Sequence, residues 1–189
     1  MVRRLLAVGL LLGSSVATAD TLDINLSNSA AQFKYGVPSG IAGKSSLFAS
    51  FLYNDNSDYL ADAGLLVLNE EGNTPGLSLG IGAKAVAASL SKVSPSRKFV
   101  SAIALGAQVR FEIPTDRRFA VVGEFHYAPG IISFGSADNF SQAAIRGEFS
   151  ISPLTQAYIG YRNSKFGMAN NLPDGELDNG AHIGVRLSF

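Results

Sequence analysis

The sequence contains no cysteine, no tryptophan and two histidines. Without cysteine, the chain has neither disulfide bonds nor the residue through which bacterial lipoproteins are attached to lipid. After the N-terminal region, glycine, serine or charged residues interrupt every apolar stretch. None of these stretches approaches the roughly 20 apolar residues that a membrane-spanning helix needs, which excludes a helical membrane protein.

The N-terminal region has the features of a secretory signal peptide. Two arginines precede an apolar run from Leu5 to Leu12, and a stretch of small residues ends at Ala19. This order of basic, apolar and small residues is typical of a cleaved export signal, and the apolar run is too short for a transmembrane anchor. We therefore predict a signal peptide over residues 1–19 and one exported domain over residues 20–189.

The charge balance of the exported domain is close to neutral. Removal of the two N-terminal arginines leaves 13 basic and 15 acidic residues, a formal net charge of −2. A chain with this balance has no electrostatic basis for binding nucleic acid. We expect no nucleic-acid partner.

Apolar and polar residues alternate along most of the chain, which is the pattern of β-strands. In FVSAIALGAQVRF, the residues at odd positions from Phe99 to Phe111 are nearly all apolar. Eight such strands follow one another from Ser45, and TLDINLSNSAAQFKYGV adds one strand or two short ones joined near Ser27. A single-chain outer-membrane barrel has an even number of strands. We predict an all-β, closed antiparallel up-and-down transmembrane β-barrel of 8–10 strands, with ten favoured.

Alternation alone fits a soluble barrel with an apolar interior or a membrane barrel with an apolar exterior. Strands of about nine or more residues, as tilted spanning strands require, favour the membrane barrel. Aromatic residues near the predicted strand ends resemble the girdles of such barrels. These residues are Tyr53, Tyr59, Phe99, Phe111, Phe119, Tyr127, Tyr161 and Phe189.

The opposite face of the predicted strands carries charges of both signs, which suits ion pairing inside a narrow lumen. We predict that this polar network consists of Lys84, Arg110, Glu124, His126, Arg146, Glu148, Arg162 and Arg186. Side chains fill a barrel of this size. The lumen is therefore expected to hold a plug of ion pairs rather than a general diffusion pore.

The last eleven residues, NGAHIGVRLSF, alternate up to the final residue. Because an unpaired strand edge is costly in lipid, this strand should close the barrel against the first one. Phe189 resembles the C-terminal aromatic signal that the outer-membrane insertion machinery recognises. Both termini would then face the periplasm, and the loops around 55–58, 91–97, 128–138 and 164–179 would lie outside the cell.

Several short motifs carry a family resemblance. Tyr127-Ala128-Pro129 is followed by Ser133-Phe134, then by Gly160-Tyr161-Arg162, and the chain ends on Phe189. These residues resemble the YfaZ family of small exported proteins of Gram-negative bacteria, and the resemblance covers most of the exported domain. It implies an outer-membrane barrel and does not specify an activity.

The sequence offers little for catalysis. His126 is followed two residues later by Ala128, where a similar-sized lipid A deacylase needs a serine. A lipid-modifying site would require Ser133 or Ser136 to approach His126, and a histidine without a nucleophile cannot run acyl transfer. The acidic residues Asp174, Glu176 and Asp178 are interpreted as a solvated loop. We expect no enzyme activity, no metal site and no cofactor.

The most direct functional interpretation is a monomeric outer-membrane barrel with a structural or surface-interaction role. Its expected partners are outer-membrane lipids and, during assembly, the insertion machinery. Two alternatives remain at this point: a narrow channel for ions or small solutes, and a soluble periplasmic ligand-binding barrel.

Overall fold

The computed structural model describes residues 20–41, 44–69, 74–91, 98–169 and 172–189. The predicted signal peptide and part of the predicted 91–97 loop lie outside these ranges. Ten long strands form the barrel: β1 (Thr21–Ser27), β2 (Ala30–Ser39), β3 (Lys44–Asn54), β4 (Tyr59–Asn69), β5 (Leu77–Leu90), β6 (Lys98–Glu112), β7 (Phe119–Ala128), β9 (Ala137–Ser152), β10 (Thr155–Met168) and β11 (Gly175–Ser188). No helix in the described residues is long and apolar enough to cross a membrane.

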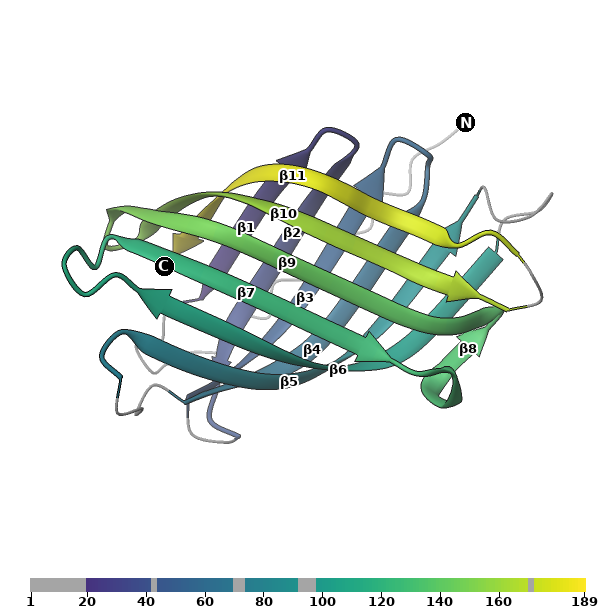
Figure 1. Ribbon diagram of the computed structural model, residues 1–189, viewed down its shortest axis with the longest axis horizontal. Helices are drawn as coiled ribbons and strands as arrows, with labels where there is room; N and C mark the ends of the chain where they lie inside the picture. The colour runs from purple at the N-terminus through teal and green to yellow at the C-terminus, as the bar shows by residue number, and fades with distance from the viewer. Residues whose placement is uncertain (1–19, 42–43, 70–73, 92–97, 170–171) are drawn as a thin grey trace, which may run out of the picture.

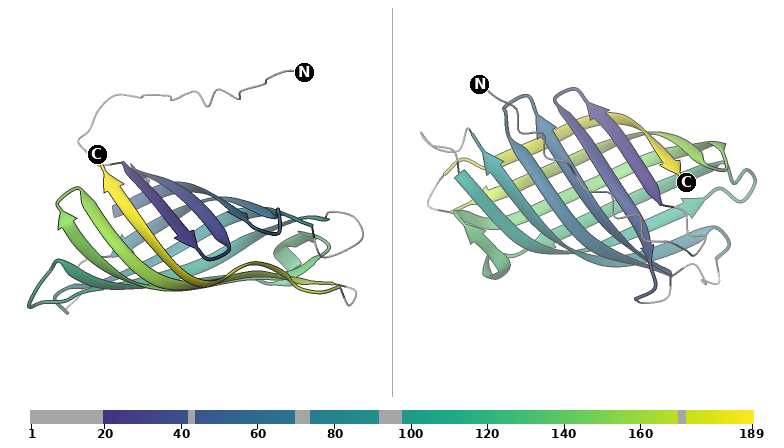
Figure 2. Two further views of the ribbon diagram at one scale, coloured as in Figure 1. Left: turned by 90° about the horizontal axis from the view of Figure 1, so that it is seen from above. Right: turned by 180° about the vertical axis from the view of Figure 1, so that it is seen from behind.

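The ten strands form a closed antiparallel barrel (Figures 1 and 2). Each strand pairs with the next along the chain, and β11 pairs with β1 from Thr21 opposite Ser188 to Ser27 opposite His182. Beyond this ladder, the backbone N–H of Phe189 donates to the carbonyl of Asp20 at 3.0 Å. The predicted fold class, the favoured strand number and the role of the last strand in closure are confirmed.

The N-terminal segment forms two strands, the second of the two alternatives left open by its sequence. The chain turns between Ser27 and Ala30, whose backbone N–H donates to Ser27 Oγ at 2.9 Å. β1 and β2 then pair from Leu26 opposite Ala31 to Thr21 opposite Gly36. This hairpin supplies the two strands that complete the ten.

The outer wall of the barrel is apolar. Large apolar side chains at the outward positions of the strands are strongly exposed, among them Ile81 at 71%, Leu105 at 63% and Ile159 at 65%. A water-soluble protein does not expose so continuous an apolar surface, whereas lipid requires one. The apolar face therefore points outward. The alternative of a soluble ligand-binding barrel, which required this face to line the interior, is wrong.

Aromatic side chains mark both ends of this outer wall. Tyr53 and Tyr59 pair across β3 and β4 near one end, and Phe119 packs against Phe149 at a ring distance of 4.9 Å near the other. Tyr161 departs from the prediction, because β10 extends to Met168 and places this tyrosine in the middle of its strand. The girdle prediction is therefore correct for strand ends but wrong for Tyr161.

Two predicted outer loops are shorter than expected. The 164–179 segment is mostly strand, because β10 continues past a bulge between Ser164 and Lys165 and β11 already begins at Gly175. A bulge breaks the two-residue period from which strands are recognised. The 128–138 segment contains a short 3₁₀ helix, η1 (Gly130–Ile132), and β8 (Ser133–Gly135), which pairs with β6 beyond the end of β7.

A charge placed on the outer wall tests its contact with lipid. Leu105 lies at the centre of β6, and Leu105→Arg should destabilise the barrel by roughly 2–4 kcal/mol because the guanidinium would lie at the bilayer midplane. The folded fraction can be followed in urea by the shift of the unboiled band on a gel. Ile113→Arg, in the turn after β6, is the matched control and should cost less than about 1 kcal/mol. Equal destabilisation by both substitutions would contradict a lipid-facing wall.

Candidate functional site in the barrel interior

The barrel interior contains two layers along its axis. All eight side chains of the predicted polar network lie in a charged layer, which occupies the middle of the barrel and the half nearest the termini. An apolar layer fills the opposite end. The strands generate both layers by the same alternation, because every second side chain of a barrel strand points inward.

Glu148 on β9 is the centre of the first ion-pair cluster. Its side chain is 2% exposed, and Oε1 accepts hydrogen bonds from Arg146 Nε at 2.7 Å and from Arg186 Nη1 at 3.3 Å. Arg110 Nη1 donates to the other oxygen. Arg146 also pairs with Glu124 at 2.8 Å, so β6, β7, β9 and β11 are joined across the lumen.

Arg162 on β10 is the centre of the second cluster. Its guanidinium donates to Asp178 Oδ2 from Nε at 2.8 Å and from Nη2 at 2.5 Å, and Nη1 donates to Gln32 and to Asn25. Asp178 is 2% exposed and also accepts a hydrogen bond from Ser27 Oγ at 2.9 Å. The interpretation of Asp178 as part of a solvated loop is wrong, because the extended β11 carries it into the lumen.

Lys84 on β5 joins the opposite wall to this interior. Its Nζ lies 3.3 Å from Asp62 Oδ2 and donates to Gln142 of β9. His126 lies beside these residues in a small enclosed space of about 40 Å³. The interior is thus crossed by polar contacts from β5 to β9 as well as between neighbouring strands.

Three acidic partners of the basic side chains were not predicted from the sequence. Asp23 pairs with Arg186 at 2.8 Å and accepts a hydrogen bond from the Tyr158 hydroxyl, and Asp62 pairs with Lys84. Both aspartates alternate with outward apolar residues, so their strand period could have revealed them. Asp178 gave no such signal, because the segment before it was assigned to a loop.

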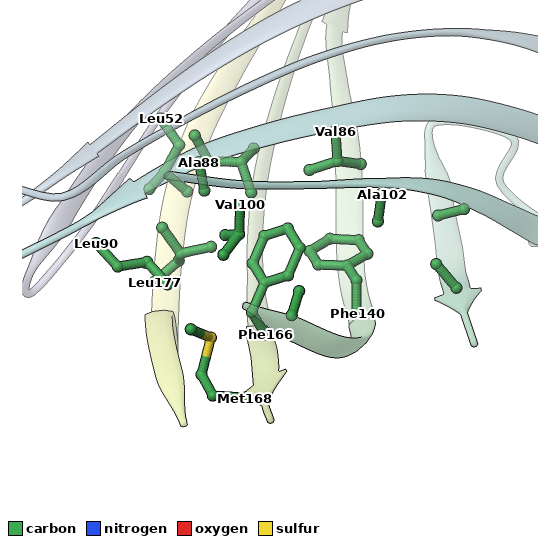
Figure 3. Close-up of a cluster of buried hydrophobic side chains, with 14 of the residues drawn as sticks. Leu52, Val86, Ala88, Leu90, Val100, Ala102, Phe140, Phe166, Met168 and Leu177 are labelled. Atoms are coloured by element: carbon green, nitrogen blue, oxygen red, sulfur yellow. The ribbon is translucent and has the colours of Figure 1, made fainter. Parts of the chain in front are cut away.

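The apolar layer closes the end of the barrel opposite the termini. Phe140 on β9 and Phe166 on β10 are fully buried, with ring centroids 4.7 Å apart, and they lie among aliphatic side chains from both walls (Figure 3). We call this layer the apolar plug. Its largest members are Leu52, Leu60, Val86, Leu90, Val100, Phe140, Phe166, Met168 and Leu177.

Leu90 shows that the plug spans the full width of the barrel. It belongs to β5, which lies five strands from β11 around the ten-strand circuit. A side chain added at Gly175 of β11 would overlap the methyl groups of Leu90. Because Gly175 has no side chain, Leu90 of the opposite wall can pack directly against the backbone of β11. Apolar packing therefore fills this end of the barrel.

The histidines have no catalytic arrangement in the described residues. The Ser133 hydroxyl is exposed and donates to the carbonyl of Pro129 at 3.1 Å, whereas His126 lies inside the lumen and is 8% exposed. His182 packs its ring edge against Tyr158 at 5.9 Å. Within the same described ranges, no group of three or more histidine, aspartate or glutamate residues could hold a metal ion.

Comparison with known proteins identifies the family. The model of the family described as YfaZ precursor matches residues 2–189. The chain belongs to the YfaZ precursor family. A search of curated proteins returned no match.

Among solved structures, an outer-membrane protein shows the same kind of fold. The outer membrane protease OmpT from Escherichia coli is 11% identical, with a TM-score of 0.55, and the match covers 91% of this chain and 93% of OmpT. The KdgM porin is 7% identical, with a TM-score of 0.45 over 90% of this chain and 99% of that chain. The outer membrane channel DcaP of Acinetobacter baumannii is 12% identical, with a TM-score of 0.44, and this YfaZ-family chain covers 54% of its length.

The family and the OmpT-like fold agree with the lipid-facing exterior. This YfaZ-family chain is an outer-membrane β-barrel, as the sequence predicted. The identities to the solved structures are too low to transfer an activity from any of them.

Neutralising Glu148 tests the ion-pair network. Glu148→Gln removes the carboxylate shared by Arg110, Arg146 and Arg186, and it should destabilise the barrel by about 3 kcal/mol because buried positive charges lose their partner. Glu112→Gln is the matched control at the rim, where the side chain is 37% exposed, and it should change stability by less than about 1 kcal/mol. Urea unfolding followed by gel mobility measures both variants, and equal stabilities would contradict the assigned role of Glu148.

Proposed function

We propose that this chain is a monomeric, non-conducting outer-membrane barrel with a structural or surface-interaction role, and that it is not an enzyme. The observation that carries the proposal is the apolar plug. Its side chains are almost completely buried and bridge opposite walls, which supports a lumen that is closed to water and ions at this end. Such tight carbon packing is typical of a folded core rather than of a pore.

Polar contacts also connect the strands at the end of the barrel opposite the termini, which we call the outer end. The side-chain amide of Asn54 on β3 donates to the carbonyl of Leu177 on β11 at 3.0 Å. Asp58, in the loop after β3, accepts hydrogen bonds from the backbone and hydroxyl of Ser91 at 2.5 and 2.7 Å. A braced outer end supports a fixed platform for surface contacts, for which loops are the usual location.

The proposed partners follow from the exterior and the last strand. Outer-membrane lipids cover the apolar wall, and the insertion machinery recognises the closing strand through Phe189, which is 65% exposed beside the first strand. The outward positions of the described strands are apolar and suited to lipid, and the long-range polar contacts of the charged layer lie inside the barrel. We therefore propose a monomer.

The alternative of a narrow channel is favoured by one observation, the charged layer that continues through about half of the interior. The two candidates differ in which layer controls conduction. If the lumen is a channel narrowed by arginines, replacing those arginines should widen it. If the apolar plug closes the lumen, the arginines have no control over the closed end.

Planar bilayer recording separates these candidates. We expect no conductance from the wild type or from the Arg110→Ala/Arg146→Ala variant, and discrete openings from the Phe140→Ala/Phe166→Ala variant, in which the plug loses two rings. Each variant is first checked for a heat-shifted gel band, so that only folded barrels are compared. Openings of the wild type, or openings produced by the arginine substitutions alone, would contradict the proposal in favour of the channel.

A loop replacement tests the surface role. Substituting residues 129–136 with a short glycine-serine turn should leave the heat-shifted band unchanged, because β7 and β9 already pair without this segment. Cells that lack the protein should admit more of a hydrophobic dye or bind fewer surface ligands than wild-type cells. The loop-replaced barrel should restore the resistance to dye entry but not the surface binding. Wild-type behaviour of the deletion strain in both assays would contradict a structural or surface role.

A further inference from the structure

The half of the interior nearest the termini contains a cavity of about 220 Å³ that neither the ion pairs nor the plug fill. It reaches the ends of β2, β3 and β4, where Pro38, Ser46 and Leu68 line it. The apolar plug closes the other end of the barrel. The cavity is therefore a blind pocket that communicates with the side on which the termini lie.

One wall of the pocket is apolar although it belongs to the inward face. Phe48, Leu66 and Leu68 occupy inward positions of β3 and β4 and remain half-buried. The inward apolar residues of the plug, by contrast, are almost completely buried. Half-buried apolar side chains in a lumen contact water, which is unfavourable until an apolar group replaces that water.

The facing wall is charged. Arg146 and Arg186 line the pocket with Glu124 and Asp23, to which they are paired at 2.8 Å in each case. Lys34 also lines it, and no carboxylate of the described residues lies within ion-pair distance of its ammonium group. Asp23 lies opposite Lys34 in the β1–β2 ladder, and Glu148 also pairs with Arg146 and Arg186. Lys34 is therefore distinguished by its lack of a direct ion-pair partner rather than by a net charge of the pocket.

Lys34 lies where the two walls meet. Its Nζ is 4.4 Å from the centroid of the Phe48 ring, so the free ammonium group adjoins the apolar wall directly. A cation is stabilised by an aromatic face, but the ring cannot neutralise the charge. A carboxylate bound at Lys34 would give this ammonium group a direct ion-pair partner and direct an attached hydrocarbon chain along the apolar wall.

The size of the cavity limits the ligand. Pockets for drug-sized molecules have volumes of roughly 300–1,000 Å³, and this one is smaller. A lipid with two acyl chains does not fit, whereas a molecule with one charged group and a short chain does. A fully polar anion would leave Phe48, Leu66 and Leu68 in contact with water.

The geometry points to a binding site for a small amphipathic anion, a carboxylate on a short aliphatic chain, in this pocket. The carboxylate binds at Lys34 with Arg186 nearby, and the chain lies against Phe48, Leu66 and Leu68. This site goes beyond the proposed structural role and does not require conduction, because a blind pocket exchanges its ligand through one end.

Equilibrium dialysis of radiolabelled hexanoate tests the site. The protein is held in phosphatidylcholine nanodiscs, and empty nanodiscs give the background from lipid partitioning. Wild type should bind hexanoate saturably, about tenfold more tightly than the neutral hexanol, because a charge-assisted contact is worth at least that factor. Acetate, which lacks the chain, should also bind more weakly than hexanoate.

Lysine substitutions locate the ligand. Lys34→Gln should weaken hexanoate binding about tenfold, and Lys34→Arg should retain it. Lys165→Gln is the matched control, because it removes a lysine that is 44% exposed and lies on β10 at the end of the barrel away from the pocket. If Lys34→Gln fails to give a heat-shifted band, the wild-type comparison of hexanoate, hexanol and acetate still decides the question.

The outcomes separate this site from the proposed function. Absence of saturable hexanoate binding by the wild type, equal affinity for hexanol, or equal affinity of the Lys34→Gln and Lys165→Gln variants would overturn the site. None of these results depends on whether the barrel conducts. Silent bilayer recordings with saturable hexanoate binding would support both the closed barrel and the pocket.

Discussion

Pairing between the first and last strands is the constraint on which the rest of this structure depends. In lipid, the N–H and C=O groups of an open sheet edge would have no partners, and each would cost several kcal/mol. The β1–β11 ladder removes both edges. Once the sheet is closed, every inward side chain shares one narrow cylinder and every outward side chain meets hydrocarbon, so two chemically different faces become obligatory.

The interior solves the problem of filling that cylinder in two ways. Where charged groups meet, each buried guanidinium is bound by carboxylates or amides from several strands, since an unpaired charge in such a place is strongly unfavourable. Where carbon meets carbon, phenylalanine and leucine pack as in a soluble core. The third region, around Lys34 and Phe48, is filled by neither kind of packing, and this difference makes it the candidate for a ligand.

Much of the fold could be predicted from the sequence because lipid enforces a strict two-residue period. The outward apolar residues of β6 and the inward arginines of β9 and β11 follow from that period alone. It fails where the ladder is irregular: the bulge after Ser164 hid the end of β10, and with it the burial of Asp178. The two-residue period could not reveal the apolar plug either. Phe140 and Leu90 are apolar residues on the inward face, which was expected to be polar. Their packing depends on contacts between strands on opposite walls, which no local pattern records.

The ion pairs of the terminal strands carry a consequence for assembly. Asp23 belongs to the first strand and Arg186 to the last, and the two side chains meet only when those strands lie side by side. Arg162 and Asp178 likewise gain Asn25, Gln32 and Ser27 from the N-terminal hairpin. Pairing of β1 with β11 and formation of these interior ion pairs therefore occur together. A barrel closed in a shifted register would keep unpaired charges inside. The electrostatics of the lumen thus favour the native register of closure over a shifted one.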